Sequence, residues 1–211
     1  GHETTKFVNG LPEGWEVKRI SDIFEVTSSK RVYLSDYVEK GIPFYRSKEI
    51  IQLASGQAIT ECLYISESTF NAFNSKFGAP KQNDILITSV GTIGVSYLVD
   101  GHTFYFKDGN LTWIKSSVEP KLALFLYRWL NSSEGKQQLL LSTIGTSQSA
   151  LTIENLKKNK LIVPSNNLIN DYYLICNGLI RQKRALQMKN QNLAKQRDLL
   201  LPRLMSGKLE V

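Results

Sequence analysis

The chain has 211 residues, of which 42% are hydrophobic, and it carries a formal net charge of +7 at pH 7. This length supports one globular domain with an appended element, and without an apolar run of about 18 residues a membrane span is not expected. The basic balance favours an anionic partner such as nucleic acid. Most of the excess lies near the C-terminus, where eight Lys and Arg face three Asp and Glu from Asn167 onward. The cysteines Cys62 and Cys176 lie far apart, which fits a reducing, cytoplasmic setting, and no Cys or His cluster suggests a metal site.

The first two thirds of the chain predict strands with a few short helices. After a tag or irregular leader over 1–10, Ser21 is expected to cap a turn over 21–24, and Ser66 a helix over 67–73. Short apolar or alternating runs predict strands. These runs cover 15–19, the stretch after Pro43, 85–89, 95–99, 103–106 and 111–115. Their close spacing and the glycines between them predict a curved, largely antiparallel sheet.

Helical patterns dominate the rest of the chain. Pro120 opens a helical stretch interrupted near residues 132–133, and Thr152 is expected to cap a helix over 153–158. A strand over 161–163 is stopped by Pro164. The predicted fold class is therefore α+β, a mixed α/β domain followed by a long C-terminal helix.

The last predicted helix runs from about Asn167 to Leu200, roughly 50 Å at 1.5 Å per residue. Residues at seven-residue intervals form one apolar seam, comprising Tyr172, Leu179, Leu186, Leu193 and Leu200. The companion heptad series begins with Leu168 and Ile175 and then becomes polar. A helix of this length is expected to pack on another long helix, because the preceding domain cannot cover it.

The sequence contains no convincing catalytic motif. The "GTIG" stretch lacks the spacing of a phosphate-binding loop and joins two predicted strands. Two E-x-K fragments, at Glu16–Lys18 and Glu134–Lys136, match a nuclease motif only by chance, and no arrangement suggests covalent catalysis. We therefore expect no catalytic residues and no cofactor bound by this chain.

Five segments in order resemble one half of the specificity (S) subunit of type I restriction–modification systems. They are "LPEGWEVKRISDI", "GIPFYRSKEI", "KQNDILITSVGTIGVSYLV", "TSQSALTIENLKKNKLIVPS" and the final "LLLPRLMSGKLEV". The resemblance implies a target recognition domain over 11–165 and a spacer helix with a tail over 166–211. It implies that two such helices pair as an antiparallel coiled coil and that each domain recognises half of a split DNA target.

The resemblance also implies partners. Methyltransferase subunits would supply S-adenosylmethionine and the active site, and a restriction subunit that uses ATP and Mg would join some of these assemblies. The chain is then either half of a longer subunit or a natural half-subunit that forms a homodimer. One alternative remains open, an assembly module that binds DNA only within the methyltransferase complex.

Polar and basic loop residues are the candidates for DNA contacts, because Lys, Arg, Ser and Thr suit phosphates and Arg, Lys, Asn and Gln suit base edges. The candidates are Ser28, Ser29, Lys30, Arg31, Tyr45, Arg46, Lys48, Thr92, Lys107, Asn110, Thr146, Ser147 and Gln148. A solvated loop or a turn hydrogen bond is the competing interpretation for each of them, and Tyr45 also suits the core.

Overall fold

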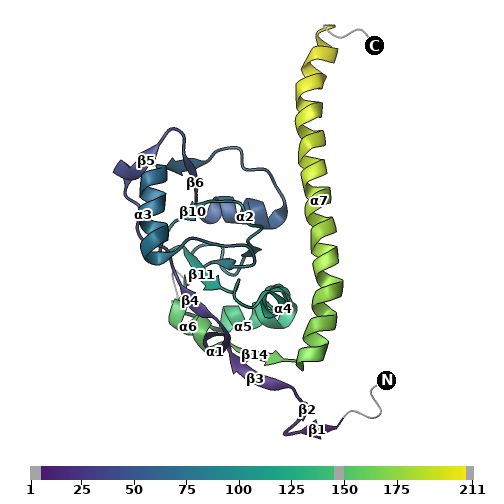
Figure 1. Ribbon diagram of the computed structural model, residues 1–211. Coiled ribbons are helices and arrows are strands. Elements are labelled where there is room, and N and C mark those ends of the chain that lie inside the picture. The colour runs from purple at the N-terminus through teal and green to yellow at the C-terminus, as the bar shows by residue number, and fades with distance from the viewer. Residues whose placement is uncertain (1–5, 145–149, 208–211) are drawn as a thin grey trace.

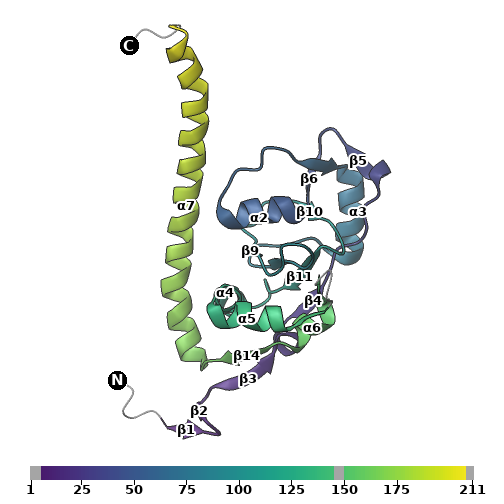
Figure 2. The ribbon, with the colours of Figure 1, turned by 180° about the vertical axis from the view of Figure 1, so that it is seen from behind.

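The computed structural model describes residues 6–144 and 150–207. Within these ranges the chain forms a mixed domain of short strands and helices, and one long helix, α7 (Asn166–Met205), runs along its side (Figure 1). Seen from behind, the C-terminal end of α7 projects beyond the domain (Figure 2). The α+β class and the long C-terminal helix predicted from the sequence are both confirmed.

One four-stranded sheet, in the order β4-β11-β8-β9, is antiparallel throughout. Its strands are β4 (Glu25–Thr27), β8 (Ile85–Thr88), β9 (Ser96–Leu98) and β11 (Leu111–Lys115). Register is fixed by pairs such as Ile114 with Val26 and Trp113 with Leu86. Strand β8 is buried along its whole length, which explains why Ile85, Leu86 and Ile87 are all apolar and the sequence does not alternate. This sheet is the centre of the domain.

A second four-stranded sheet, in the order β10-β6-β7-β5, is mixed. Its strands are β5 (Tyr37–Val38), β6 (Ile42–Tyr45), β7 (Leu63–Ile65) and β10 (Tyr105–Phe106). Strand β10 pairs with β6 in parallel, whereas the other pairs are antiparallel. Largely antiparallel pairing is thus confirmed, but the predicted single sheet is divided into two four-stranded sheets and smaller ladders.

Three two-stranded ladders complete the strand pairing. They are β1 (Phe7–Val8) with β2 (Leu11–Pro12), β3 (Glu16–Arg19) with β14 (Lys160–Val163), and β12 (Thr143–Ile144) with β13 (Ala150–Leu151). The β3–β14 ladder joins the beginning of the domain to the strand that leads into α7. It therefore fixes where α7 leaves the domain.

Short helices cover the sheets. They are α1 (Ile20–Ile23), the 3-10 turn η1 (Leu34–Asp36), α2 (Ser47–Ser55), α3 (Glu67–Phe77), α4 (Pro120–Leu130), α5 (Ser133–Leu141) and α6 (Ile153–Lys158). The predicted caps of α3 and α6 are confirmed, since Ser66 Oγ accepts from Thr69 N at 3.1 Å and Thr152 Oγ1 accepts from Asn155 N at 3.2 Å. The interruption between α4 and α5 also lies where it was predicted.

Several local predictions were wrong. Helix α3 extends to Phe77, four residues beyond its predicted end. Helix α1 is capped by Arg19, whose backbone N–H donates to the Asp22 carboxylate at 2.9 Å, and not by Ser21. Helix α2 occupies a stretch for which no helix was predicted. Helix α7 continues through Pro202 to Met205, five residues beyond the predicted end.

Candidate nucleic-acid interface

Loops from distant parts of the sequence meet at one end of the central sheet, where β4 and β8 end and β11 begins. Ser28 Oγ donates to Leu111 O at 3.0 Å, and Ser89 N donates to Asn110 O at 2.9 Å. Ala150, which resumes the described chain, forms a bridge with Val90. Ser47 Oγ, at the start of α2, donates to Asn110 O at 3.4 Å. Residues 28–31, 46–48, 89–94 and 107–110 at this end of the sheet are called the loop edge below.

Two serines at the loop edge hold loops together. Ser29 Oγ donates to Phe106 O at 2.7 Å, and Ser28 makes the bond to Leu111 O given above. The backbone N–H of Lys30 donates to the Tyr105 hydroxyl at 3.1 Å. These bonds tie the loop after β4 to the β10–β11 connection. Each serine hydroxyl still has free acceptor capacity, but its proton is used within the domain.

Four predicted cations at the loop edge already have partners within the domain, and three of them are held loosely. Arg31 Nε lies 3.1 Å from Asp108 Oδ2, and Lys48 Nζ lies 3.3 Å from Glu61 Oε2. Lys30 Nζ lies 4.6 Å above the Phe77 ring. The Arg31 side chain is 69% exposed, so its pair is solvent-screened and can exchange the carboxylate for a phosphate at low cost.

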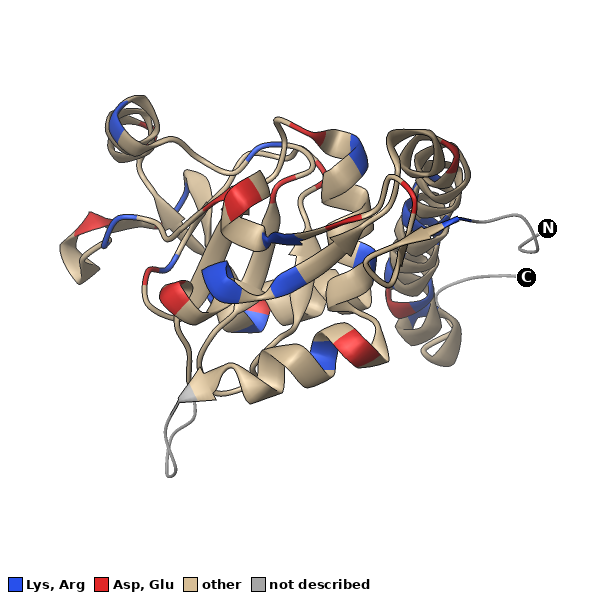
Figure 3. Ribbon diagram, turned by 90° about the horizontal axis from the view of Figure 1, so that it is seen from below, with Lys and Arg blue, Asp and Glu red and all other residues tan. Residues whose placement is uncertain are grey.

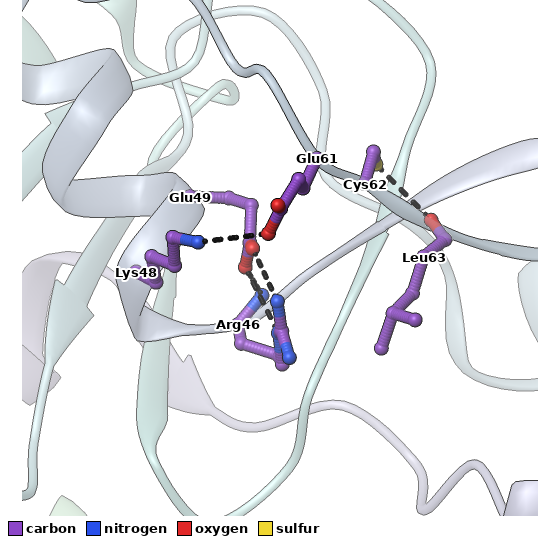
Figure 4. A network of polar contacts seen from close by, with 6 residues as sticks. All are labelled: Arg46, Lys48, Glu49, Glu61, Cys62 and Leu63. Carbon is purple, nitrogen blue, oxygen red and sulfur yellow. Dashed lines mark hydrogen bonds and ion pairs between the residues drawn. The ribbon is translucent and has the colours of Figure 1, made fainter.

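Arg46, the fourth cation, is held more firmly (Figure 4). Its Nη2 lies 2.7 Å from Glu49 Oε1, and its backbone N–H donates to Glu49 Oε2 at 2.7 Å, at the N-terminus of α2. The Glu49 side chain is fully buried. Burial acts to raise the pKa of Glu49, but the bonds from Arg46 outweigh it and lower that pKa below its usual value. Arg46 therefore compensates a buried charge and positions the start of α2.

The remaining candidates differ in exposure. Tyr45 is buried, stacks on Phe104 with ring centroids 4.8 Å apart, and shares its hydroxyl with His102 Nε2 at 3.1 Å. Burial raises its pKa. Thr92 is exposed in the turn between β8 and β9, whereas Lys107 and Asn110 are half-buried. Tyr45 thus supports the loop edge from beneath and is not placed to stack on a base.

Three of the candidates, Thr146, Ser147 and Gln148, lie outside the described residues. Among the described residues, no group of three or more His, Cys, Asp or Glu is arranged to hold a metal ion. No helix in the described part of the chain is long and apolar enough to cross a membrane. The E-x-K fragment at Glu16–Lys18 forms its own ion pair at 2.7 Å on a surface strand.

The apolar seam of α7 lies mostly on the surface. Tyr172 packs edge-on against Phe125 of α4, with ring centroids 5.6 Å apart. Leu179, Leu186 and Leu193 are 59 to 61% exposed, and Leu200 is 46% exposed. These four leucines therefore receive little cover from their own domain.

Some polar residues make contacts within the chain that their sequence pattern did not predict. His102 Nδ1 bonds to the Asp100 carboxylate in the turn after β9. Burial acts to raise the pKa of Asp100, but the His102 hydrogen bond outweighs it and lowers that pKa to about 2. Arg184 and Gln191 of α7 bond to backbone carbonyls of the domain. No local motif marks these two residues of α7, since their partners are 86 and 135 positions away.

The chain was compared with known protein families and with individual proteins. The family described as the type I restriction modification DNA specificity domain matches residues 12–170. The chain belongs to this family. A Haemophilus influenzae protein, the putative type I restriction enzyme specificity subunit S.HindORF215P, is 31% identical over 150 residues, which cover 71% of this chain and 36% of that protein. The type I restriction enzyme MjaIX specificity subunit of Methanocaldococcus jannaschii is 28% identical over 204 residues, covering 95% of this chain and 46% of that subunit.

Solved structures agree on the fold. The S subunit of a type I restriction–modification system from M. genitalium has a TM-score of 0.60 at 20% identity, covering 95% of this chain and 48% of that one. The HsdS subunit from Thermoanaerobacter tengcongensis has a TM-score of 0.54 at 16% identity, covering 99% of this chain and 48% of that one. The chain spans about half the length of these structures and less than half of the two curated relatives. The resemblance drawn from the sequence is confirmed.

Proposed function

We propose that this chain is the DNA-recognition module of a type I specificity subunit and that its loop edge contacts one half of a split DNA target. The single observation that carries the proposal is the convergence at one sheet end of loops from four separate parts of the sequence. Exposed Arg31, Lys48 and Thr92 supply groups for phosphates, and Lys107 and Asn110 supply groups suited to base edges. Arg46, Ser28 and Ser29 hold these loops in place.

The chain itself is proposed to be non-catalytic and to bind no cofactor. S-adenosylmethionine, ATP and Mg would be used by methyltransferase and restriction subunits that assemble with it in the cytoplasm. The recognition domain is assigned to residues 11–165 and the spacer helix with its tail to 166–211.

The exposed leucines of α7 support a helix–helix contact. We propose that α7 pairs antiparallel with the helix of a second recognition half, either in a homodimer or in a longer chain. Burial of exposed leucine surface is favourable, by about 1.5 to 3 kcal/mol for a fully exposed side chain, so the half-exposed seam leucines favour such a contact. Two recognition domains held at opposite ends of such a pair would require a two-part target with a fixed gap.

Selection of duplexes from a randomised pool, followed by binding measurements at several salt concentrations, tests the DNA contact. Arg31→Ala with Lys48→Ala should reduce the slope of log affinity against log salt, by about 0.9 for each phosphate that the variant no longer neutralises. Lys157→Ala is the matched control, because Lys157 lies on α6 and pairs with Glu154 at 2.9 Å, as Arg31 pairs with Asp108. Recovery of no preferred sequence, or equal effects of both variants, would contradict the proposal.

A second candidate function is that of an assembly module that binds DNA only within a methyltransferase complex. The pairing of Arg31, Arg46 and Lys48 with carboxylates favours it, because those charges are partly neutralised in the single chain. Binding measured with and without the cognate methyltransferase distinguishes the two. Sequence-specific affinity that appears only in the mixture would favour the assembly module.

A further inference from the structure

Helix α7 contacts its domain in two zones of different chemistry. Near its start the contact is mainly apolar: Ile169 is buried, Tyr172 packs on Phe125, and Tyr173, Cys176 and Ile180 lie against the core. Lys121 of α4 adds a hydrogen bond to Asn170 at 2.6 Å. Beyond Ile180 the residues of α7 that face the domain are mainly polar, with Met188 and Ala194 as exceptions. The first zone fixes one point of the helix, and a second point is needed to fix its direction.

The second zone consists of two side chains that reach backbone carbonyls. Arg184 Nη2 donates to Leu98 O, at the end of β9, at 2.8 Å. Gln191 Nε2 donates to Gly56 O, at the C-terminus of α2, at 3.0 Å. The two acceptors belong to different elements of the domain. Since a backbone carbonyl cannot move without its strand or helix, these bonds hold the domain itself and not a mobile side chain.

Gly56 allows α2 and α7 to approach closely. Its φ is +79°, and a Cβ at this position would lie 2.1 Å from Gln187 Nε2. A larger residue would therefore have to displace Gln187, which lies on the same face of α7 as Arg184 and Gln191. The close approach brings Gly56 O within reach of Gln191.

Packing alone does not fix this second zone. A cavity of about 580 Å³ lies between the domain and α7, lined in part by Asp100, His102, Arg184, Gln187 and Gln191. The buried hydroxyl of Tyr97, which also lines it, has no hydrogen-bond partner in the described structure. Where side chains leave such space, the two directional bonds determine the relative placement of domain and helix.

We propose that Arg184 and Gln191 are positioning residues that set the angle between the recognition domain and α7, and thereby the gap between half-sites that the assembly accepts. This inference rests on the proposed function. It assigns part of target specificity to two residues that do not lie at the loop edge.

Distances between labels test the angle directly. Labels attached through an unnatural amino acid at Ser75 of α3 and Lys195 of α7 report the domain–helix distance, and excess unlabelled chain restricts the signal to one chain. Arg184→Ala with Gln191→Ala should broaden the distance distribution. Lys189→Ala with Asn192→Ala is the matched control, because it also removes one cation and one amide, both exposed on α7. Gly56→Ala, which keeps both donors, should shift the distribution.

Duplexes from the selection, with their half-sites moved apart in single base-pair steps, test the consequence for DNA. The wild-type chain should prefer one gap by about tenfold or more, whereas the Arg184→Ala/Gln191→Ala variant should bind neighbouring gaps nearly equally. Affinity for a duplex with one half-site should not change, which separates positioning from a general loss of folding. An unchanged distance distribution, or an unchanged gap preference, would overturn the inference. Failure of the proposed function is distinguishable, because the wild-type chain would then select no DNA while the distances would still report the angle.

Discussion

The recognition domain and α7 differ in how far their apolar side chains are buried and in whether their cations are paired. In the central sheet of the domain Ile85, Leu86 and Ile87 are fully buried, whereas Leu179, Leu186 and Leu193 of α7 are mostly exposed. Several cations of the domain pair with carboxylates, whereas most of the Lys and Arg that the view along α7 shows on that helix (Figure 3) have no ion pair among the described residues. The difference teaches that the domain satisfies its own interactions, while α7 has an apolar surface suited to another molecule.

The largest loss of domain stability is expected on substitution of Asp84. This residue is buried and accepts hydrogen bonds from Trp113 Nε1, Lys81 N and Ser117 N, each at 2.9 Å. Asp84→Ala leaves these three donors without an acceptor, so the free energy of unfolding should fall by about 3 to 4 kcal/mol. Urea unfolding followed by tryptophan fluorescence measures this loss. Asp198→Ala on α7 is the control and should change it by less than about 0.5 kcal/mol. Equal losses would contradict the contrast between domain and helix.

Loss of the ion pair at the start of α2 should lower the free energy of unfolding less than loss of Asp84 does. Glu49→Gln removes the charge that Arg46 compensates, at an expected cost of about 2 kcal/mol near neutral pH. Because the folded-state pKa of Glu49 is lowered from 4.5, its stabilisation is present above that value and is lost as the pH falls through the lowered pKa. Unfolding curves of the two proteins should therefore converge in acid. A difference that stays constant through the acid range in which Glu49 becomes protonated would show that the charge of Glu49 is not responsible.

Asp100, near the boundary between domain and helix, should contribute still less to the free energy of unfolding. Its side chain is 40% exposed, so solvent screening limits the effect of Asp100→Asn to about 1 kcal/mol or less. The stabilisation is present above pH 3.8, the usual pKa, and is lost as the pH falls toward the folded-state value of about 2. Thermal unfolding between about pH 5 and pH 2 measures it. An effect that grew above about pH 5 would point to another group.

The seam leucines should hardly affect domain stability. Leu186→Lys with Leu193→Lys should change the unfolding free energy of the domain by less than about 0.5 kcal/mol, because both side chains are exposed in the single chain. Self-association through α7 should nevertheless be abolished, since two charges would enter an apolar interface. Sedimentation velocity distinguishes monomer from dimer. Asn190→Lys with Asn192→Lys adds the same charge elsewhere on α7 and should leave association intact.

Local signals predicted much of the fold. Helix α6 and strand β11 have the predicted bounds, because Thr152 as an N-cap and the apolar, β-branched run of Leu111–Lys115 are signals carried by neighbouring residues. Helix α2 was missed although its signals were present: Glu49 three residues after Arg46 and Gly56 after the last turn. The polar run at its start was interpreted as the end of a strand.

Non-local pairing limited the rest of the prediction. The parallel pairing of β10 with β6 joins Tyr105 to Phe44, and nothing in either strand indicates the other. The same limit applies to the candidate site. Composition indicated Arg31 and Arg46 as basic loop residues, but only the structure places carboxylates of Asp108 and Glu49 beside them. The DNA contacts themselves remain a prediction.

The length of α7 makes small angular errors at its base large at its tip. The helix has 40 residues, which corresponds to about 60 Å at 1.5 Å per residue. A tilt of about 5° would move its far end by roughly 5 Å, or about one and a half base pairs of B-DNA. A helix of this length acts as a lever arm, because a small tilt at its base becomes a large displacement at its tip. Side-chain bonds that lie well along it, beyond the apolar contact at its start, resist such a tilt with greater mechanical advantage than contacts near the pivot.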